Sequence, residues 1–115
     1  MNLVQITFTV FLAVAAGGLL LAILVARNAR IPAVLSTGHG LAGLLAICGL
    51  FAVNLHMGDV TTSRSWWALG VLLSGFIGGL LFFRVIFKDR ATLPLVFAHG
   101  GVAAIGLYLL FSVAF

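Results

Sequence analysis

The chain has 115 residues, of which 63% are hydrophobic and only 7% are charged. A soluble domain carries about 25% charged residues, so this composition excludes a water-soluble globular domain and indicates membrane-spanning helices. The net charge is +4, but no basic run lies outside the apolar segments, which argues against nucleic acid as a partner.

Four apolar segments follow one another, and each is close to the ~20 residues that cross the hydrocarbon core of a bilayer. The predicted helices cover about Leu3–Ala26, Ile31–Leu55, Trp66–Phe87 and Ala91–Phe115. The first has no positively charged n-region and is too long for a signal peptide, so we interpret it as a retained helix. Because the connections are short, we expect an all-α, up-down, four-helix transmembrane bundle forming one domain over residues 1–115.

Several local signals agree with these boundaries. Pro32 and Pro94 fall in the first turns of the second and fourth predicted helices, where a missing N–H costs little. Ser63 or Ser65 is expected to cap the third helix. Cys48 lies in the middle of the second segment, and we interpret it as a small buried hydrophobic residue.

The basic residues are distributed unevenly over the connections. Arg27, Arg30, Lys88 and Arg90 flank the first and third connections, whereas Arg64 is alone in the second. The positive-inside rule then places both chain ends outside. We expect an integral membrane protein, of the kind found in a bacterial inner membrane.

The second half of the chain resembles the first. A shift of sixty residues aligns 18–53 with 78–113 without a gap and matches Arg30 with Arg90, His39 with His99 and Gly40 with Gly100. We predict two repeated helical hairpins, about 1–60 and 61–115, related by an axis along the membrane normal.

Glycine and other small residues recur at four-residue spacing, which favours close helix packing in lipid. The third segment carries Gly70, Ser74 and Gly78, with Gly75 and Gly79 beside them. The first segment has Gly18 with Ala22 and Ala26.

The repeated histidines are the strongest functional signal. His39 and His99 lie at the same depth on helices that occupy one diagonal of the expected bundle, so their side chains are expected to meet across its centre. Two such imidazoles can bind the iron of haem b from opposite sides. We therefore predict His39 and His99 as metal ligands.

The residues around the histidines fit the same prediction. A macrocycle needs small neighbours, and its carboxylates need cations near the membrane surface. We expect small residues from Gly40, Gly43 and Gly100, and cations from Arg27, Arg30 and Arg90.

Other interpretations of the pair remain open. An intramembrane histidine can form an interhelical hydrogen bond or carry protons. Zinc or copper would need further ligands, and Cys48 is more than two helical turns from His39.

Four helices with paired histidines on the second and fourth resemble a minimal membrane b-type cytochrome, broadly similar to cytochrome b561. The residues that carry the resemblance are His39 and His99. It implies electron transfer, often between a quinol pool and a redox partner. The sixty-residue counterpart of His56 would fall beyond Phe115, so we expect one haem.

A quinone site would need hydrogen-bonding groups in an apolar cleft. On the outer side, His56, Asp59 and Asn54 are candidates, and Asp59 beside His56 could accept protons. The alternative is that these residues form a solvated loop.

Functions without a cofactor also remain possible from the sequence. A small transporter or channel would have this size, and a structural subunit or homo-oligomer would use the glycine-rich faces. No Ser/His/Asp set, carboxylate pair, phosphate loop or CxxC motif is present, so the sequence indicates an electron-transfer subunit rather than a stand-alone enzyme.

Overall fold

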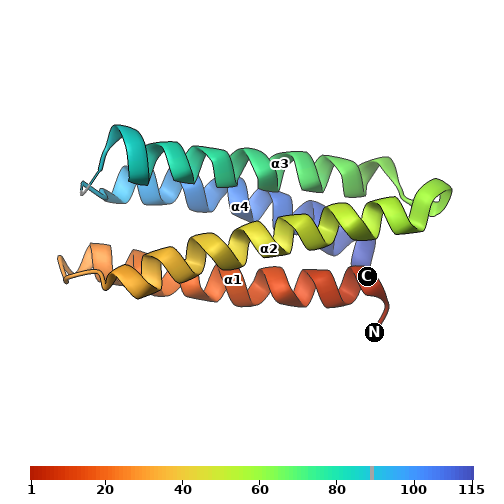
Figure 1. Ribbon diagram of the computed structural model, residues 1–115, viewed down its shortest axis with the longest axis horizontal. Coiled ribbons are helices and arrows are strands. Elements are labelled where there is room, and N and C mark those ends of the chain that lie inside the picture. Colours follow the sequence, from red (N-terminus) through yellow and green to blue (C-terminus); the bar gives the residue numbers. More distant parts are fainter. Residues whose placement is uncertain (89) are drawn as a thin grey trace.

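The protein is a bundle of four long helices, seen in a computed structural model that describes residues 1–88 and 90–115 (Figure 1). The helices are α1 (Leu3–Ala26), α2 (Ala33–Met57), α3 (Ser63–Leu80) and α4 (Leu93–Ala114). A short 3-10 helix, η1 (Gly58–Val60), follows α2, and a π-helical turn, η2 (Leu81–Ile86), follows α3. The described residues contain no strand, so the prediction of an all-helical chain with four helices is confirmed.

Polar caps and prolines set the helix starts. Asn2 accepts a hydrogen bond from the Gln5 amide (2.9 Å), and the Gln5 side chain accepts one from the Asn2 amide (3.1 Å). This reciprocal pair satisfies two amides that the first turn leaves unpaired. The prediction of a serine cap on α3 is wrong, because the hydroxyl of Thr62 accepts from the Ser65 amide. Pro94 lies in the first turn of α4, as predicted.

Successive helices run in opposite directions and form a four-cornered bundle. The packed neighbours are α1 with α2, α2 with α3, α3 with α4, and α4 with α1. Helices α2 and α4 therefore lie on one diagonal. Both chain ends lie at the same end of the bundle as η1, while the α1–α2 and α3–α4 connections lie at the opposite end (Figure 1). We call these the terminal end and the connection end.

The dimensions and surface suit a membrane. The molecule measures 46 × 24 × 19 Å, and a bilayer with its headgroup regions is about 40–45 Å thick. All four helices, with their η1 and η2 extensions, are long and apolar enough to cross it. Many large apolar side chains point outward from the bundle, which is the arrangement expected where lipid is the solvent.

The tightest packing joins α3 to α4. A Cβ atom added to Gly106 would lie 2.6 Å from Cγ of Leu72, and one added to Gly75 would lie 3.1 Å from Cγ1 of Val102. By contrast, nothing lies within 4 Å of the corresponding positions at Gly70 and Gly78. Of the small residues predicted to pack, Gly18, Gly75 and Gly79 make close contacts with another helix, whereas Gly70 and Gly78 do not.

The fully buried centre lies toward the terminal end, around Leu50 and Leu110, which have no exposed surface. Two polar ties close the bundle there. Ser65 donates to Oδ1 of Asn54 (2.6 Å), and the Gln5 side chain donates to the carbonyl of Ala114 (3.0 Å). These pairs are related by the sixty-residue shift, because residue 54 corresponds to 114 and residue 5 to 65.

The interpretation of Cys48 as buried is wrong. Its side chain is exposed on the outside of α2, because its position on the helix turns it away from the bundle centre. It therefore cannot add a ligand to an interior site.

Candidate functional site

The structure brings His39 and His99 together. His39 projects from α2 and His99 from α4, and the centroids of their rings are 6.3 Å apart with an angle of 82° between the ring planes. Both side chains are half-buried. The two helices do not pack as neighbours, so the rings meet across the diagonal of the bundle.

His99 is held by the main chain of α3. Its Nδ1 lies 3.0 Å from the carbonyl oxygen of Gly75. Because a carbonyl can only accept, Nδ1 carries the proton, and in the neutral ring Nε2 keeps its lone pair. Metal-binding histidines commonly have this arrangement, with one nitrogen fixed by a carbonyl and the other free for the metal.

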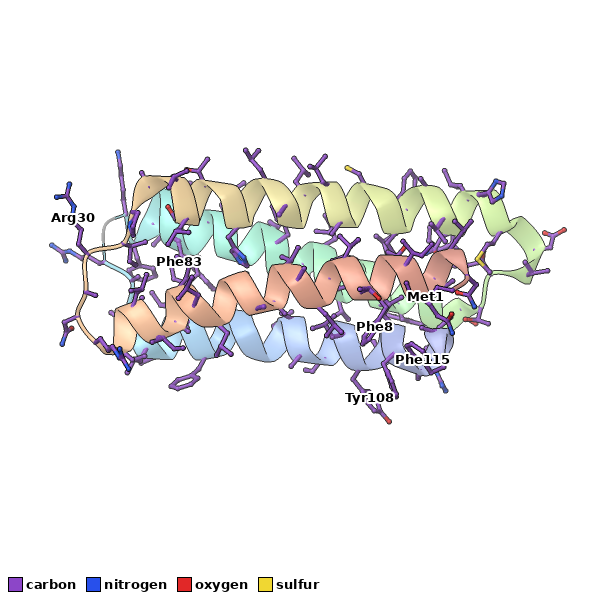
Figure 2. The ribbon with its side chains drawn as sticks, turned by 90° about the horizontal axis from the view of Figure 1, so that it is seen from below. Met1, Phe8, Arg30, Phe83, Tyr108 and Phe115 are labelled. Carbon is purple, nitrogen blue, oxygen red and sulfur yellow. The ribbon has the colours of Figure 1, made fainter. Side chains whose placement is uncertain are left out.

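The glycine beside His99 is required by sterics. A Cβ atom added to Gly79 would lie 2.6 Å from Cε1 and 2.8 Å from Nδ1 of His99. Phe83, from η2, contacts the same ring edge-on with a centroid distance of 5.8 Å, and Figure 2 places Phe83 among the helices near the connection end. Three consecutive turns of α3 and η2 therefore enclose His99.

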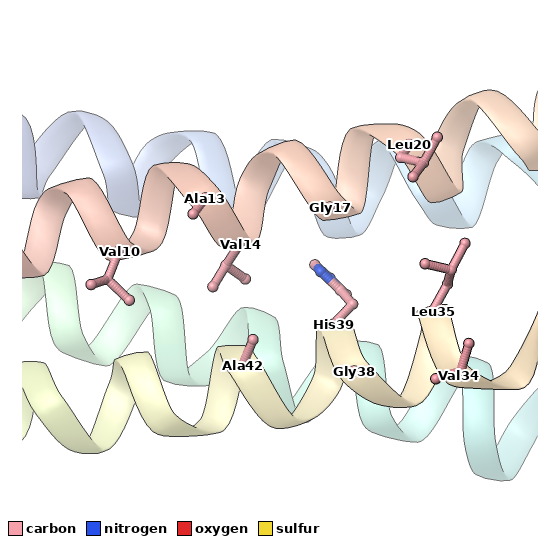
Figure 3. A pocket seen from close by; sticks show the side chains of 10 residues that line it. All are labelled: Val10, Ala13, Val14, Gly17, Leu20, Val34, Leu35, Gly38, His39 and Ala42. Carbon is pink, nitrogen blue, oxygen red and sulfur yellow. The ribbon is translucent and has the colours of Figure 1, made fainter.

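His39 leans on α1 in a similar way but lacks the hydrogen bond. A Cβ atom added to Gly18 would lie 3.0 Å from Cε1 of His39, and one added to Gly17 would lie 3.7 Å from Nδ1. Nδ1 is buried and makes no hydrogen bond of regular geometry among the described residues, although the backbone of Val14 on α1 lies close to the ring. The ring points from α2 toward α1 in Figure 3.

The glycines predicted to surround the histidines do not contact the rings. No atom comes within 4 Å of a Cβ added to Gly40 or Gly100, and one added to Gly43 meets Phe76 at 3.7 Å. The glycines in contact with the histidines belong instead to the facing helices, namely Gly17, Gly18 and Gly79. The four-residue spacing of Gly75 and Gly79 in the sequence indicates a face of α3 that packs closely against another helix. The sequence alone does not show which of these glycines faces the histidine ring.

The predicted cations lie at the connection end of the bundle. Arg27, Arg30 and Arg90 are exposed, and Arg30 points away from the helices in Figure 2. The structure does not bring them into contact with the histidine pair.

A different arginine joins the two hairpins. Arg84, in η2, donates to the hydroxyl of Thr37 (3.1 Å) and approaches that of Ser36 (3.5 Å) in the first turn of α2. Thr37 is two residues before His39, so this contact ties η2 to the segment that carries one of the two rings.

The three residues considered for a quinone site do not form a cluster. His56 and Asp59 are exposed, whereas Asn54 is only 1% exposed and faces Ser65. Asn54 therefore makes a structural hydrogen bond with Ser65 that its sequence position does not reveal.

The distance between the ring centroids is close to that of two imidazoles on one metal ion, but in this structure the nitrogen-bearing edge of His39 lies against Gly18 of α1 and that of His99 lies against Gly79 of α3. An imidazole nitrogen binds a metal at about 2 Å, and the ring centre lies about 1 Å farther on, so two such rings have centres about 6 Å apart. The observed 6.3 Å agrees with this value. The described residues contain no group of three or more His, Cys, Asp or Glu side chains that could hold a metal. A metal bound here would take its remaining ligands from another molecule, as haem iron does from a porphyrin.

Comparison of the chain with known proteins gave no match to a family profile, to a curated protein or to a solved structure.

Proposed function

We propose that this protein is a membrane-embedded electron-transfer protein, or a subunit of one, that holds a single haem b between His39 and His99. The observation that carries the proposal is the 6.3 Å separation of the two rings across the bundle diagonal. Histidines are costly to bury inside a membrane, so such residues usually have a function, and the closeness of these two rings supports a ligand that both would bind.

Different residues of this chain would bind the iron, orient its ligands and supply positive charge. His39 and His99 would be the two axial ligands, and the Gly75 carbonyl would fix the orientation of His99. Gly18 and Gly79 leave the space that the rings occupy. Arg27, Arg30 and Arg90 would supply positive charge at the connection end. When bound, haem supplies reversible one-electron chemistry, and its axial ligands and surroundings set its potential.

The membrane setting completes the proposal. The four helices would form a transmembrane bundle of two repeated hairpins, with both termini outside a bacterial inner membrane. The sixty-residue relation between the Asn54–Ser65 and Ala114–Gln5 ties supports this repeat. Electrons would pass between a quinol pool and a redox partner, which could be another subunit or a second copy of the chain.

The test is an absorption spectrum of protein purified in detergent after expression with haem available. We expect a Soret band that shifts on reduction with dithionite, a sharp α band, and about one haem per chain. His39→Ala and His99→Ala should each abolish the low-spin, six-coordinate spectrum, because either change removes one axial ligand.

His56→Ala is the matched control, because His56 is exposed near the terminal end of α2. It should leave the spectrum unchanged. Helical protein that binds no haem would refute the proposal and favour a proton-carrying or hydrogen-bonded histidine pair. A low-spin spectrum retained in both ligand variants would place the haem elsewhere.

A further inference from the structure

Positive charge gathers at the connection end of the bundle, and both hairpins contribute to it. The basic residues there are Arg27, Arg30, Arg84, Lys88 and Arg90. All of them are exposed, and Arg30 extends beyond the ends of the helices in Figure 2. The only acidic residue that the sequence places in these two connections is Asp89. This end of the molecule is therefore a surface that attracts anions.

Arg84 is the member of this group that lies within a candidate membrane span, Ser63–Ile86. Its Nη2 donates to the hydroxyl of Thr37 (3.1 Å) and approaches that of Ser36 (3.5 Å). Both partners are neutral, and both contacts use one nitrogen of the guanidinium. The positive charge and the remaining N–H groups of Arg84 can therefore still bind an anion. The Thr37 hydroxyl also has a proton to donate, for which no acceptor lies among residues 1–88 and 90–115.

Large apolar side chains are exposed within three residues of both Arg84 and Thr37. Val34 is 77% exposed on α2, and Val85 and Ile86 are 65% and 59% exposed on η2. In a membrane such side chains face lipid chains. A ligand that contacts both these side chains and the guanidinium must carry negative charge directly beside hydrocarbon.

Anionic phospholipids have this structure. They are abundant in the cytoplasmic leaflet, and basic groups between helices on that side bind their headgroups. The positive-inside rule leads us to expect the connection end on the same side. Arginine is well suited to this contact, because its planar guanidinium can donate two parallel hydrogen bonds to a phosphate.

We propose that Arg84 and Thr37 form a binding site for the headgroup phosphate of an anionic phospholipid. The phosphate accepts hydrogen bonds from free N–H groups of Arg84 and from the Thr37 hydroxyl, while the acyl chains lie along the exposed apolar side chains of α2 and η2. Because Arg84 and Thr37 belong to different hairpins, the bound lipid ties the hairpins together at the connection end. The site uses neither histidine, so the inference is independent of the proposed haem.

The first experiment measures lipid binding by native mass spectrometry of the full chain in detergent. The protein is titrated with phosphatidylglycerol, which is anionic, and with phosphatidylcholine of the same acyl chains, which has no net charge. We expect phosphatidylglycerol to bind several-fold more tightly. Equal affinity for the two lipids would overturn the proposal.

Arg84→Gln tests the guanidinium, and we expect it to remove most of the preference for phosphatidylglycerol. Arg64→Gln is the matched control, because it removes the same charge from an exposed arginine toward the terminal end. It should keep the wild-type preference. Equal losses in the two variants would show that the preference follows total charge and not a site at Arg84.

Thr37→Val tests the site with every charge in place and remains informative if Arg84→Gln fails to fold. It removes the hydroxyl that contacts Arg84, so phosphatidylglycerol should bind several-fold more weakly while phosphatidylcholine binding stays unchanged. Circular dichroism checks that the variant is helical. Thr9→Val, at an exposed position of α1, should bind both lipids as the wild type does. Wild-type affinity in Thr37→Val would refute the site.

The last experiment distinguishes a lipid from a free anion. Amide hydrogen exchange is measured in nanodiscs of phosphatidylcholine alone and of phosphatidylcholine mixed with phosphatidylglycerol. We expect slower exchange in Leu81–Ile86 when phosphatidylglycerol is present, because a ligand that binds the folded turn stabilises it. Inorganic phosphate added to the phosphatidylcholine nanodiscs should not reproduce the effect. Equal slowing by phosphate would overturn the assignment to a lipid, and no slowing by phosphatidylglycerol would overturn the tie between the hairpins.

Discussion

At the scale of single residues, the site depends on glycines that lie on neighbouring helices and not beside the histidines in sequence. Gly78 and Gly79 are adjacent in the chain, yet only Gly79 faces a ring, because consecutive helical residues point about 100° apart. Adding one methyl group therefore has opposite consequences at the two positions. This contrast makes the packing around His99 directly testable.

Gly79→Ala should destabilise the protein and disturb His99. The new Cβ would lie 2.6 Å from Cε1 of His99, and overpacking of this kind costs about 1–3 kcal/mol. Unfolding in increasing concentrations of a denaturing detergent, followed by circular dichroism, measures the loss.

Gly78→Ala is the control, because nothing lies within 4 Å of its added Cβ. Its free energy of unfolding should stay within about 0.5 kcal/mol of the wild type, or rise slightly through better helix propensity. Equal destabilisation by both variants would contradict the packing described for His99.

The buried Asn54–Ser65 hydrogen bond is a second test at this scale. Ser65→Ala removes the donor and leaves Oδ1 of Asn54 without its 2.6 Å partner. Interhelical hydrogen bonds in membrane proteins are worth about 0.6–1.7 kcal/mol, so a loss of about 1 kcal/mol is expected in the same unfolding measurement.

Ser74→Ala is the comparison for this bond. The exposed Ser74 hydroxyl donates to the Val71 carbonyl within its own helix (2.7 Å), so its removal breaks no contact between helices. If the two serine variants were equally stable, the Asn54–Ser65 tie would contribute nothing measurable.

At the scale of elements, the end of α3 is the irregular part of the bundle. Residues 81–86 form a π-helical turn, and such turns often occur at functional sites. This turn carries both Phe83, which contacts His99, and Arg84, which reaches Thr37 on α2. One short element thus contacts the two helices that supply the histidines.

Thr37→Val should loosen this element. Valine has nearly the shape of threonine but cannot accept the 3.1 Å hydrogen bond from Arg84. We expect faster amide hydrogen exchange in Leu81–Ile86, because its tertiary contact to α2 is weakened.

Thr9→Val is suited as the control, since the exposed Thr9 hydroxyl bonds to the Gln5 carbonyl in its own helix (2.9 Å). Its exchange in Leu81–Ile86 should match the wild type. Unchanged exchange in Thr37→Val would show that Arg84 does not stabilise the turn.

At the scale of the whole molecule, charge is concentrated at one end. Five of the six basic residues belong to the connection end, namely Arg27, Arg30, Arg84, Lys88 and Arg90, and Arg64 lies toward the terminal end. Positive charge near short connections favours the cytoplasmic side. We therefore expect both termini on the opposite side.

Reporter fusions to the C-terminus test this orientation in a bacterial host. Alkaline phosphatase fused after Phe115 should be active, because it folds outside the cytoplasm, and green fluorescent protein at the same position should be dark. Fusions placed between Arg27 and Arg30 should give the reverse. A fluorescent C-terminal fusion would show that the bundle is inserted the other way round.

The sequence by itself determined the helices, because their length and apolarity follow from composition and from the dimensions of a bilayer. The bounds of α1 matched the prediction at both ends, and the other starts shifted by two or three residues where Pro32, Thr62 and Thr92 lie before the first helical turns. The repeat also singled out His39 and His99, since a polar ring in an apolar helix is visible without any knowledge of packing.

Only the tertiary structure decided what surrounds those rings. The rotation of each helix about its axis selected Gly18 and Gly79 over Gly40 and Gly100, exposed Cys48, and directed Arg84 to Thr37. Such rotations result from the simultaneous packing of four helices, and no single segment encodes them. For the same reason, two histidines that are equivalent in sequence differ in the structure, where His99 has the Gly75 carbonyl and His39 lines a groove between α1 and α2.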